Sequence, residues 1–308
     1  MKILLLGANG QVGFELARSL APLGELVCAT RSGALAGGAP CLTANLAQPE
    51  SLAATLDAVR ADVIVNAAAY TAVDRAEDET DLAQRVNAQA LAEIGAHAAL
   101  HDALVVHYST DYVFDGAGSR PYRENDATAP LGVYGRSKLD GENALRASGC
   151  DHLILRTAWV YAARGHNFLR TMLRLARERE ELRIVGDQRG APTPARLISA
   201  TTAVLLARLL ARRAGERDKR LGTYHLCAAD QCTWFDFASA IFVRARTAGL
   251  LERLPRLVPI ATSDYPTPAR RPAYSVLDCR KIRDAFGLYL PSWKEGLSSV
   301  IGELASSA

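Results

Sequence analysis

A tyrosine and a lysine four positions apart are the first residues in this chain that could do chemistry together. Tyr134 and Lys138 form the pattern Y-x-x-x-K, and on a helix positions i and i+4 share one face. A nearby ammonium favours the phenolate and so lowers the pKa of a tyrosine from about 10 towards neutrality. Such a phenol can give a proton to the alkoxide that develops when a carbonyl is reduced.

The choice of lysine at this position strengthens the interpretation. The chain has only five lysines among its 36 basic residues, and Lys138 is the only one between Lys2 and Lys219. A compact ammonium can reach both a ribose and a phenol, which a planar guanidinium does not replace. Thr110, at the end of an expected strand, adds a hydroxyl that can hydrogen-bond a substrate carbonyl. We therefore predict that Thr110, Tyr134 and Lys138 form a catalytic group.

A glycine-rich loop near the N-terminus indicates the cofactor for such a reduction. Gly7, Gly10 and Gly13 lie between an expected strand and an expected helix. In this context glycines permit a tight turn and a close approach of the backbone to a pyrophosphate, and the helix N-terminus offers free N–H groups to the phosphates. The spacing of three and three is typical of the extended short-chain dehydrogenase/reductase family.

The residues after the second and third expected strands bear on the choice of cofactor. Arg31 stands where an acidic residue would hold an adenosine ribose hydroxyl, and arginine there favours a 2′-phosphate. This position favours NADPH over NADH, although a surface arginine is the alternative interpretation. After the third strand, members of the extended short-chain dehydrogenase/reductase family often carry an aspartate that lies beside the adenine. This chain has Asn45 and Leu46 at that point. Asparagine can still hydrogen-bond adenine, so we keep both as cofactor-binding candidates.

A parallel sheet is needed to bring these residues together. Apolar runs alternate with helical patterns in the first half, which implies a sheet covered on both faces, and right-handed crossovers make it doubly wound. Ligands bind at the carboxyl ends of the strands of such sheets. The expected strands are 2–6, 25–30, 62–66, 103–109 and 152–157. The first expected helix follows the glycine loop and ends near residue 22, and three more span 49–60, 81–100 and 132–147.

The pattern becomes less regular after residue 157. We expect helices at 168–181, 197–212 and 233–248, a strand at 222–226, and irregular loops at 186–194 and 264–272. The fold class is therefore α/β, a Rossmann-type doubly wound parallel sheet with a smaller mixed α/β domain at its C-terminal side. Residues 1–160 are expected to form the NAD(P)-binding domain, and residues 161–308 mainly the second domain, with some segments returning to the first.

Composition excludes several classes of function. The net charge is only +3 and no Lys/Arg-rich run occurs, so nucleic-acid binding has no support. No apolar stretch is long enough to span a bilayer, and the start of the chain lacks the pattern of a secretion signal. None of the six cysteines form a C-x-x-C pair, so they are interpreted as free thiols in a reducing compartment. We expect a cytoplasmic protein.

Longer strings of residues resemble the dTDP-4-dehydrorhamnose reductase family. The most particular of them is STDYVFDG at 109–116, which is more specific than a glycine loop. The resemblance runs in order over nearly the whole chain and includes the second half. Its other parts are NAAAYTAVD at 66–74, RTAWVY at 156–161, GDQRGAPT at 186–193, GTYH at 222–225, and Arg271-Pro272 with Ser275.

The resemblance implies reduction of the 4-keto group of dTDP-4-dehydro-β-L-rhamnose to dTDP-L-rhamnose, with NADPH or NADH, in dTDP-rhamnose biosynthesis. It implies that Thr110 bonds the substrate oxygen, that Tyr134 donates the proton, and that Lys138 binds the nicotinamide ribose. The second domain would bind the nucleotide sugar. Further contacts implied are Gly10, Gln11, Val12, Ala69, Tyr70 and Thr71 for the cofactor, and Asp111 and Trp159 for the sugar.

Some other residues could take part in binding. Arg270 and Arg271, in the proline-rich loop, are candidates for the pyrophosphate of the substrate, with surface charge as the alternative. His107 and His225 lie inside apolar strands and are interpreted as structural. Some relatives form homodimers through a magnesium ion held by glutamates near the first helix, where this chain has Glu15. One glutamate does not make a magnesium site, so no metal is predicted.

Two alternative functions remain from the sequence. The first is a reductase of another dTDP-4-keto-deoxysugar, since the same acid would serve and only the sugar pocket differs. A dual epimerase and reductase would need an additional acid/base pair, such as Cys and His, which is not clearly placed here. The second alternative is a non-catalytic, NADP-binding regulatory subunit, against which Thr110, Tyr134 and Lys138 argue.

Overall fold

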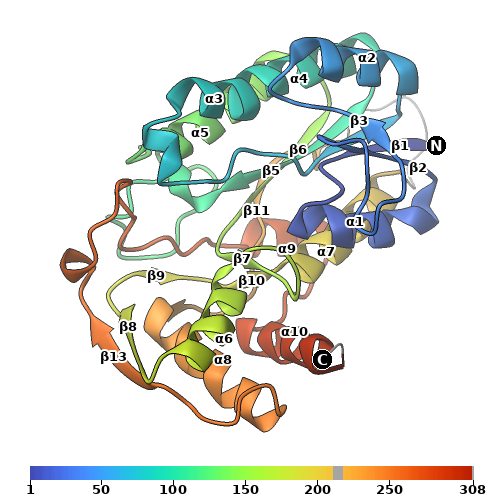
Figure 1. The fold of residues 1–308 in the computed structure, drawn as a ribbon. Helices are drawn as coiled ribbons and strands as arrows, with labels where there is room; N and C mark the ends of the chain where they lie inside the picture. Colours follow the sequence, from blue (N-terminus) through green and yellow to red (C-terminus); the bar gives the residue numbers. More distant parts are fainter. Residues whose placement is uncertain (211–217, 307–308) are drawn as a thin grey trace.

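The strands of the main sheet carry several of the predicted site residues at or just after their carboxyl ends. The computed structural model describes residues 1–210 and 218–306. Within them, seven strands form a parallel sheet in the order β11-β6-β5-β4-β1-β2-β3 (Figure 1), with the topological switch point between β1 and β4. The strands are β1 (Lys2–Leu6), β2 (Glu25–Thr30), β3 (Leu42–Thr43), β4 (Val63–Asn66), β5 (Leu104–Thr110), β6 (His152–Thr157) and β11 (Gly222–His225).

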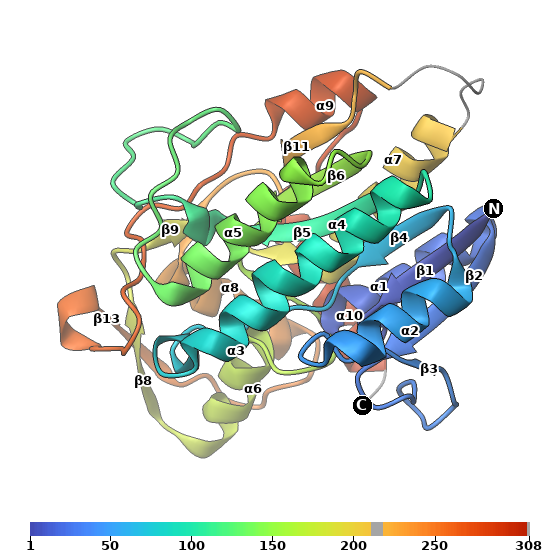
Figure 2. The ribbon, with the colours of Figure 1, turned by 90° about the horizontal axis from the view of Figure 1, so that it is seen from above.

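Helices cover both faces of this sheet, as Figures 1 and 2 show. Apolar side chains of α1 (Gln11–Leu20), α7 (Ala195–Leu210) and α9 (Arg280–Phe286) pack on one face. Those of α2 (Pro49–Val59), α4 (Ala90–Leu100) and α5 (Val133–Ala147) pack on the other. Both faces are therefore buried, which explains the continuous apolar strands, and the predicted fold class is confirmed. None of the helices in the described ranges is long and apolar enough to cross a membrane.

The helix predicted at 81–100 is interrupted. The structure has α3 (Thr80–Gln84), a π-turn η3 (Arg85–Gln89) and then α4. Asn87 lies in the π-turn, and its amide bonds both the N–H and the C=O of Tyr70, at 2.9 and 3.0 Å. A π-turn often marks a functional site, and here it aims Asn87 at the loop that follows β4.

A smaller unit lies against the carboxyl edge of the main sheet, in the lower part of Figure 1. Its core joins α6 (Phe168–Glu178), α8 (Trp234–Thr247) and α10 (Trp293–Ser306). The prediction of one helix over 168–181 is wrong at its end, because β8 (Glu181–Val185) begins there and pairs in parallel with β13 (Arg256–Ile260). The β13 strand was not predicted, since its sequence contains a proline, which only an edge strand tolerates.

The second half of the chain returns to the first. The α7 helix packs on α1, where the hydroxyls of Ser19 and Ser199 lie 3.1 Å apart. The helix predicted at 197–212 corresponds to α7. Positions 211 and 212 of that prediction lie outside the described residues. The strand predicted at 222–226 is β11, which pairs with β6 and forms one edge of the main sheet. The other described strands form three two-stranded sheets. These are β7 (Val160–Tyr161) with β10 (Thr193–Pro194), β9 (Arg189–Gly190) with β12 (Cys232–Thr233), and β8 with β13.

Candidate active site

One large cavity contains nearly all of the predicted site residues. It has a volume of about 1930 Å³ and is lined by residues of both the main sheet unit and the smaller unit. Small-ligand pockets are usually about 300–1,000 Å³, so this one has room for two ligands. The predicted residues that line it are Gly7, Gly10, Gln11, Val12, Arg31, Asn45, Leu46, Ala69, Tyr70, Thr71, Thr110, Asp111, Tyr134, Lys138 and Trp159, while Gly13 does not.

The glycine loop is shaped by close backbone contacts. Gly7 has a φ of +82°, and a Cβ there would lie 2.7 Å from the backbone nitrogen of Ala68. A Cβ on Gly13 would lie 2.0 Å from the carbonyl oxygen of Gly7, so Gly13 serves helix–strand packing and not ligand contact. The first turn of α1 carries no acidic residue. Gly10 is the N-cap and has no side chain, so the N–H groups at the start of α1 have no side-chain cap. This end of α1 therefore fits a pyrophosphate.

Gln11 connects the glycine loop to the smaller unit. Its Oε1 accepts from Asn167 Nδ2 at 2.8 Å, and its Nε2 donates to the carbonyl of His166 at 3.3 Å. Asn167 is buried and caps the N-terminus of α6. A ligand phosphate beside Gln11 would therefore touch a residue that both units hold in place.

The expected adenosine end is less completely built. Arg31 is exposed at the end of β2 and lines the cavity. Asn45 Oδ1 accepts from the N–H of Ala47 at 3.1 Å, so the carbonyl end of the side chain stabilises its own turn. Leu46 is buried beside it. Arg31 thus places an exposed positive charge at this end of the cavity.

Thr110 and Asp111 stand at the carboxyl end of β5. Thr110 Oγ1 accepts from the N–H of Tyr112 at 3.2 Å and donates to Asp111 Oδ1 at 3.0 Å. Asp111 is 2% exposed, and its Oδ2 has no partner among the described residues. Burial raises its pKa to about 6, although hydrogen bonds from Ser275 and Thr110 oppose the rise. Asp111 Oδ2 is therefore available to a substrate. The single hydroxyl proton of Thr110 is given to Asp111 and must turn away from it to bond a substrate oxygen.

Tyr134 lies in the first turn of α5 with its ring edge-on to that of Tyr112, at a centroid distance of 5.6 Å. Burial raises the pKa of the Tyr134 phenol above its usual value, and its hydrogen bond with Thr110 only partly opposes this rise. Burial therefore acts against the predicted lowering of the Tyr134 pKa. Because the phenol stays protonated, it can act as an acid.

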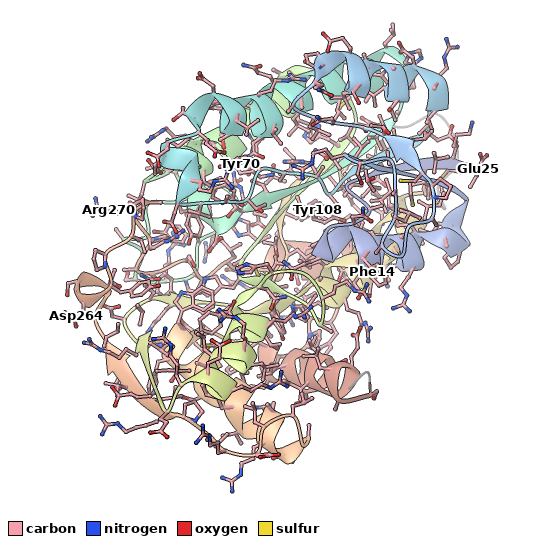
Figure 3. The ribbon with its side chains drawn as sticks, viewed as in Figure 1. Phe14, Glu25, Tyr70, Tyr108, Asp264 and Arg270 are labelled. Carbon is pink, nitrogen blue, oxygen red and sulfur yellow. The ribbon has the colours of Figure 1, made fainter. Side chains whose placement is uncertain are left out.

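Lys138 is fully buried one turn after Tyr134 on α5. Its Nζ donates to the carbonyl of Tyr108 at 2.6 Å and lies 3.1 Å from His107 Nε2. Burial lowers the pKa of Lys138 to about 7, which Glu142 opposes. His107 and Tyr108, of which Figure 3 labels Tyr108, are neighbours in β5, so this strand makes both contacts with Lys138 Nζ. The interpretation of His107 as merely structural is therefore incomplete, since no motif in the sequence linked it to Lys138.

Trp159 is placed at the cavity by a strained backbone. Its φ is +47°, a conformation that non-glycine residues rarely adopt. Its ring stacks on Trp234 of α8, with centroids 3.5 Å apart and planes 6° apart. One face of Trp159 is therefore covered by protein, and only the rest of the ring can contact a sugar. Trp234 also lines the cavity and was missed, because its helix is far away in the sequence.

The proline-rich loop at 264–272 reaches back to the main unit. Arg271 donates to Asp74 Oδ2 at 2.6 Å, and the backbone N–H of Ala269 donates to Asp74 Oδ1 at 3.2 Å. Arg271 lines the cavity and Arg270 does not; Asp264 and Arg270 mark the loop in Figure 3. Of the two arginines, only Arg271 therefore stays a candidate for the substrate pyrophosphate.

The surroundings of Glu15 do not fit a magnesium ion. Arg196 Nε lies 3.5 Å from Glu15 Oε2, and Arg196 Nη2 donates to Glu303 Oε2 at 2.8 Å. A guanidinium thus stands between the two carboxylates where a divalent cation would need oxygen ligands. The described residues contain no group of three or more His, Cys, Asp or Glu that could hold a metal.

Comparisons with known proteins agree with this geometry. The family model described as RmlD substrate binding domain matches residues 1–306. The chain is 49% identical to a dTDP-4-dehydrorhamnose reductase of Burkholderia thailandensis over 99% of this chain and all of that protein. It is 48% identical to the protein of that name from Shigella flexneri, over 99% and 98% of the two chains.

A solved structure supports the same assignment. The dTDP-4-dehydrorhamnose reductase of Bacillus anthracis in complex with NADP superposes with a TM-score of 0.84. It is 32% identical and the match covers 98% of this chain and 99% of that one. The predicted resemblance is thus confirmed over the whole length, and the chain belongs to the RmlD family, in which these relatives are dTDP-4-dehydrorhamnose reductases.

Proposed function

We propose that this protein is an NAD(P)H-dependent reductase that converts dTDP-4-dehydro-β-L-rhamnose to dTDP-L-rhamnose. The observation that carries the proposal is the position of Thr110, Tyr134 and Lys138 in the cavity that also holds the glycine loop. The relatives described above bear the name of this activity. A nucleotide-sugar substrate is also consistent with a cavity large enough for a second ligand.

The side chains then divide the work of one carbonyl reduction. The nicotinamide, when bound, supplies the hydride. Thr110 turns its hydroxyl proton from Asp111 to the C4 oxygen of the sugar. As the C=O π bond breaks, the oxygen gains negative charge that this hydrogen bond stabilises. Tyr134 gives its phenolic proton to that oxygen, so a C–H and an O–H bond form. The phenolate left on Tyr134 must regain a proton before the next turnover.

The test is the reaction itself. Purified protein is mixed with dTDP-4-dehydro-β-L-rhamnose, generated in situ, and the loss of nicotinamide absorbance is followed with NADPH and NADH in parallel. We expect oxidation with stoichiometric formation of dTDP-L-rhamnose, identified by mass and NMR. Oxidation only with a different dTDP-4-keto-deoxysugar would contradict the substrate. Tight cofactor binding without turnover of any keto-sugar would favour the regulatory-subunit alternative.

Arg31 is expected to favour NADPH through the 2′-phosphate. Arg31→Ala should raise the KM for NADPH about tenfold and leave that for NADH unchanged, because a hydrogen bond to a charged group contributes about 1.5–3 kcal/mol and this arginine is exposed. Steady-state kinetics with both cofactors measures the change. Arg283→Ala, an exposed arginine on α9 outside the cavity lining, serves as control. Equal effects on both cofactors would contradict this role.

Further parts of the proposal concern organisation. We assign the cofactor to the unit of residues 1–160 and the nucleotide sugar mainly to residues 161–308, with α7 and β11 belonging structurally to the first unit. Cytoplasmic location is proposed because the cofactors and the sugar nucleotide are used there. A homodimer is proposed on the family resemblance alone, and sedimentation of the purified protein tests it.

A further inference from the structure

A chain of buried side chains lies behind Lys138. Asn66, at the end of β4, and His107, in β5, are 2% and 1% exposed. Asn66 Nδ2 lies 3.3 Å from His107 Nδ1, and His107 Nε2 lies 3.1 Å from Lys138 Nζ. Asn66 and Lys138 line the cavity, whereas His107 lies behind them. The three groups therefore form one line of contacts that ends at the expected site of the nicotinamide ribose.

The direction of the first contact follows from the backbone. Asn66 Oδ1 accepts from the N–H of Ala68 at 3.1 Å, so the NH2 end of the amide must face His107. An amide NH2 group only donates, and Nδ1 of His107 must therefore accept. A neutral imidazole that accepts at Nδ1 carries its proton on Nε2.

The second contact then constrains Lys138. The Nε2–H of His107 points at Nζ, and an ammonium has three donors and no acceptor. A charged Lys138 would thus place two donors against each other at 3.1 Å. An uncharged amine accepts this bond with its lone pair and still donates to the carbonyl of Tyr108 at 2.6 Å. Burial acts in the same direction, because it lowers the pKa of Lys138 to about 7 and that of His107 well below its usual value.

The charges near Lys138 do not offset the effect of burial on its pKa. Glu142, one turn further along α5, raises the pKa of Lys138, but its carboxylate is already paired with Arg156 and Arg146. The elements packed around this part of α5 carry further ionisable groups. They include Tyr134 itself, Tyr108 of β5, Asp111 and Tyr112 of η4 (Asp111–Val113), Glu77 of η2 (Arg75–Glu77), which accepts from the N–H of Val133, and Arg85 of η3, which pairs with Glu93. Arg75, Asp81, Arg136 and Asp140 on these elements are exposed.

We propose that His107 and Asn66 are positioning residues that hold Lys138 as an uncharged amine in the cofactor-free protein, and that cofactor binding draws one proton onto this amine. The inference rests on the proposed role of Lys138 at the nicotinamide ribose. The ribose hydroxyls offer acceptors that His107 does not, so the bound state favours the ammonium. The proton comes from a buffer acid, which loses it as the new N–H bond forms on the lone pair of Nζ.

Proton uptake can be measured without turnover. Binding of NADPH, and separately of NADH, is followed by isothermal titration calorimetry in buffers of different ionisation enthalpy at about pH 8.5. This pH is well above the second pKa, about 6, of a phosphate group, so the 2′-phosphate does not contribute. We expect the wild type to take up close to one proton with either cofactor, because a lysine with an ordinary pKa of about 10.4 is charged at this pH.

Four variants show which side chains cause the proton uptake. Lys138→Met should bind without proton uptake. His107→Gln should bind with little uptake, because its amide oxygen can accept from an ammonium that is already present. Asn66→Asp provides a second test, since a carboxylate accepts from both Ala68 N–H and His107 Nδ1–H and leaves Nε2 free to accept. His225→Gln, at another buried histidine outside the cavity lining, should keep the wild-type uptake.

The outcomes are distinct. Uptake near zero in the wild type, or uptake that persists in Lys138→Met, would overturn the inference. Full uptake in both His107→Gln and Asn66→Asp would overturn the role of the His107–Asn66 pair and leave burial as the cause. Failure of both cofactors to bind would contradict the proposed function itself, whereas binding without uptake would contradict only this inference.

Discussion

Replacing Tyr134 with phenylalanine is expected to lower kcat by about 10²–10⁴-fold, the usual contribution of a positioned general acid. Tyr134→Phe keeps the ring and its edge-on contact with Tyr112 but removes the proton that the C4 alkoxide needs. Because the proton moves only in the transition state, kcat and kcat/KM should fall together while KM changes little. Steady-state kinetics of NADPH oxidation and calorimetric binding of NADPH measure the two effects.

A matched control separates loss of the acid from loss of a buried hydroxyl. Tyr161 is also buried, its hydroxyl has no partner among the described residues, and it does not line the cavity. Tyr161→Phe should therefore keep the wild-type kcat. A Tyr134→Phe variant that retains more than about one tenth of wild-type kcat would contradict the assignment, since proton transfer would then come from another group.

The local parts of this site could be predicted because their geometry is local. Two side chains at i and i+4 on a helix share a face whatever surrounds the helix, and Tyr134 and Lys138 meet at the cavity accordingly. The glycine loop follows from adjacent elements for the same reason. Gly7 and Gly13 are needed by backbone contacts with Ala68 and with each other.

What could not be predicted depends on contacts between distant segments. The contact of His107 with Lys138 joins β5 to α5, and an apolar strand around a histidine carries no sign of such a partner. The stacking of Trp234 on Trp159 joins residues 75 positions apart. The direction of the Tyr134 pKa was missed for a related reason. Burial depends on the whole fold, whereas the sequence shows only the spacing to the nearest cation.

The topology shows the same division. The strands of the first half follow from their apolar runs. The chain reaches β11 beside β6 only after α6, β8 and α7, so no adjacent element indicates its place in the sheet. The β8 strand was hidden because its residues continue a helical pattern of Arg and Glu. Tertiary pairing with β13 decides there against local propensity.

The largest effect on stability is expected at Glu142, which holds the buried face of α5 against the sheet. Glu142 is fully buried, and its two oxygens accept from Arg156 at 2.8 and 2.7 Å. Glu142→Ala leaves the Arg156 guanidinium, which is 2% exposed, without its carboxylate. Removing one partner of a buried ion pair typically costs about 3–5 kcal/mol. Urea unfolding followed by circular dichroism should show a loss of that size.

Two further variants show whether charge or packing causes this loss. Glu178→Ala removes the carboxylate of an exposed pair with Arg174, whose side chain is 61% exposed, and should cost no more than about 1 kcal/mol. Glu142→Leu combined with Arg156→Met should recover much of the stability, because it removes both buried charges together. If the double variant were as unstable as Glu142→Ala, the lost contacts of Arg156 with Phe114 and the Glu124 carbonyl would be the cause, and not an unpaired charge. Recovery would instead mean that the unpaired buried charge of Arg156 causes the loss in Glu142→Ala.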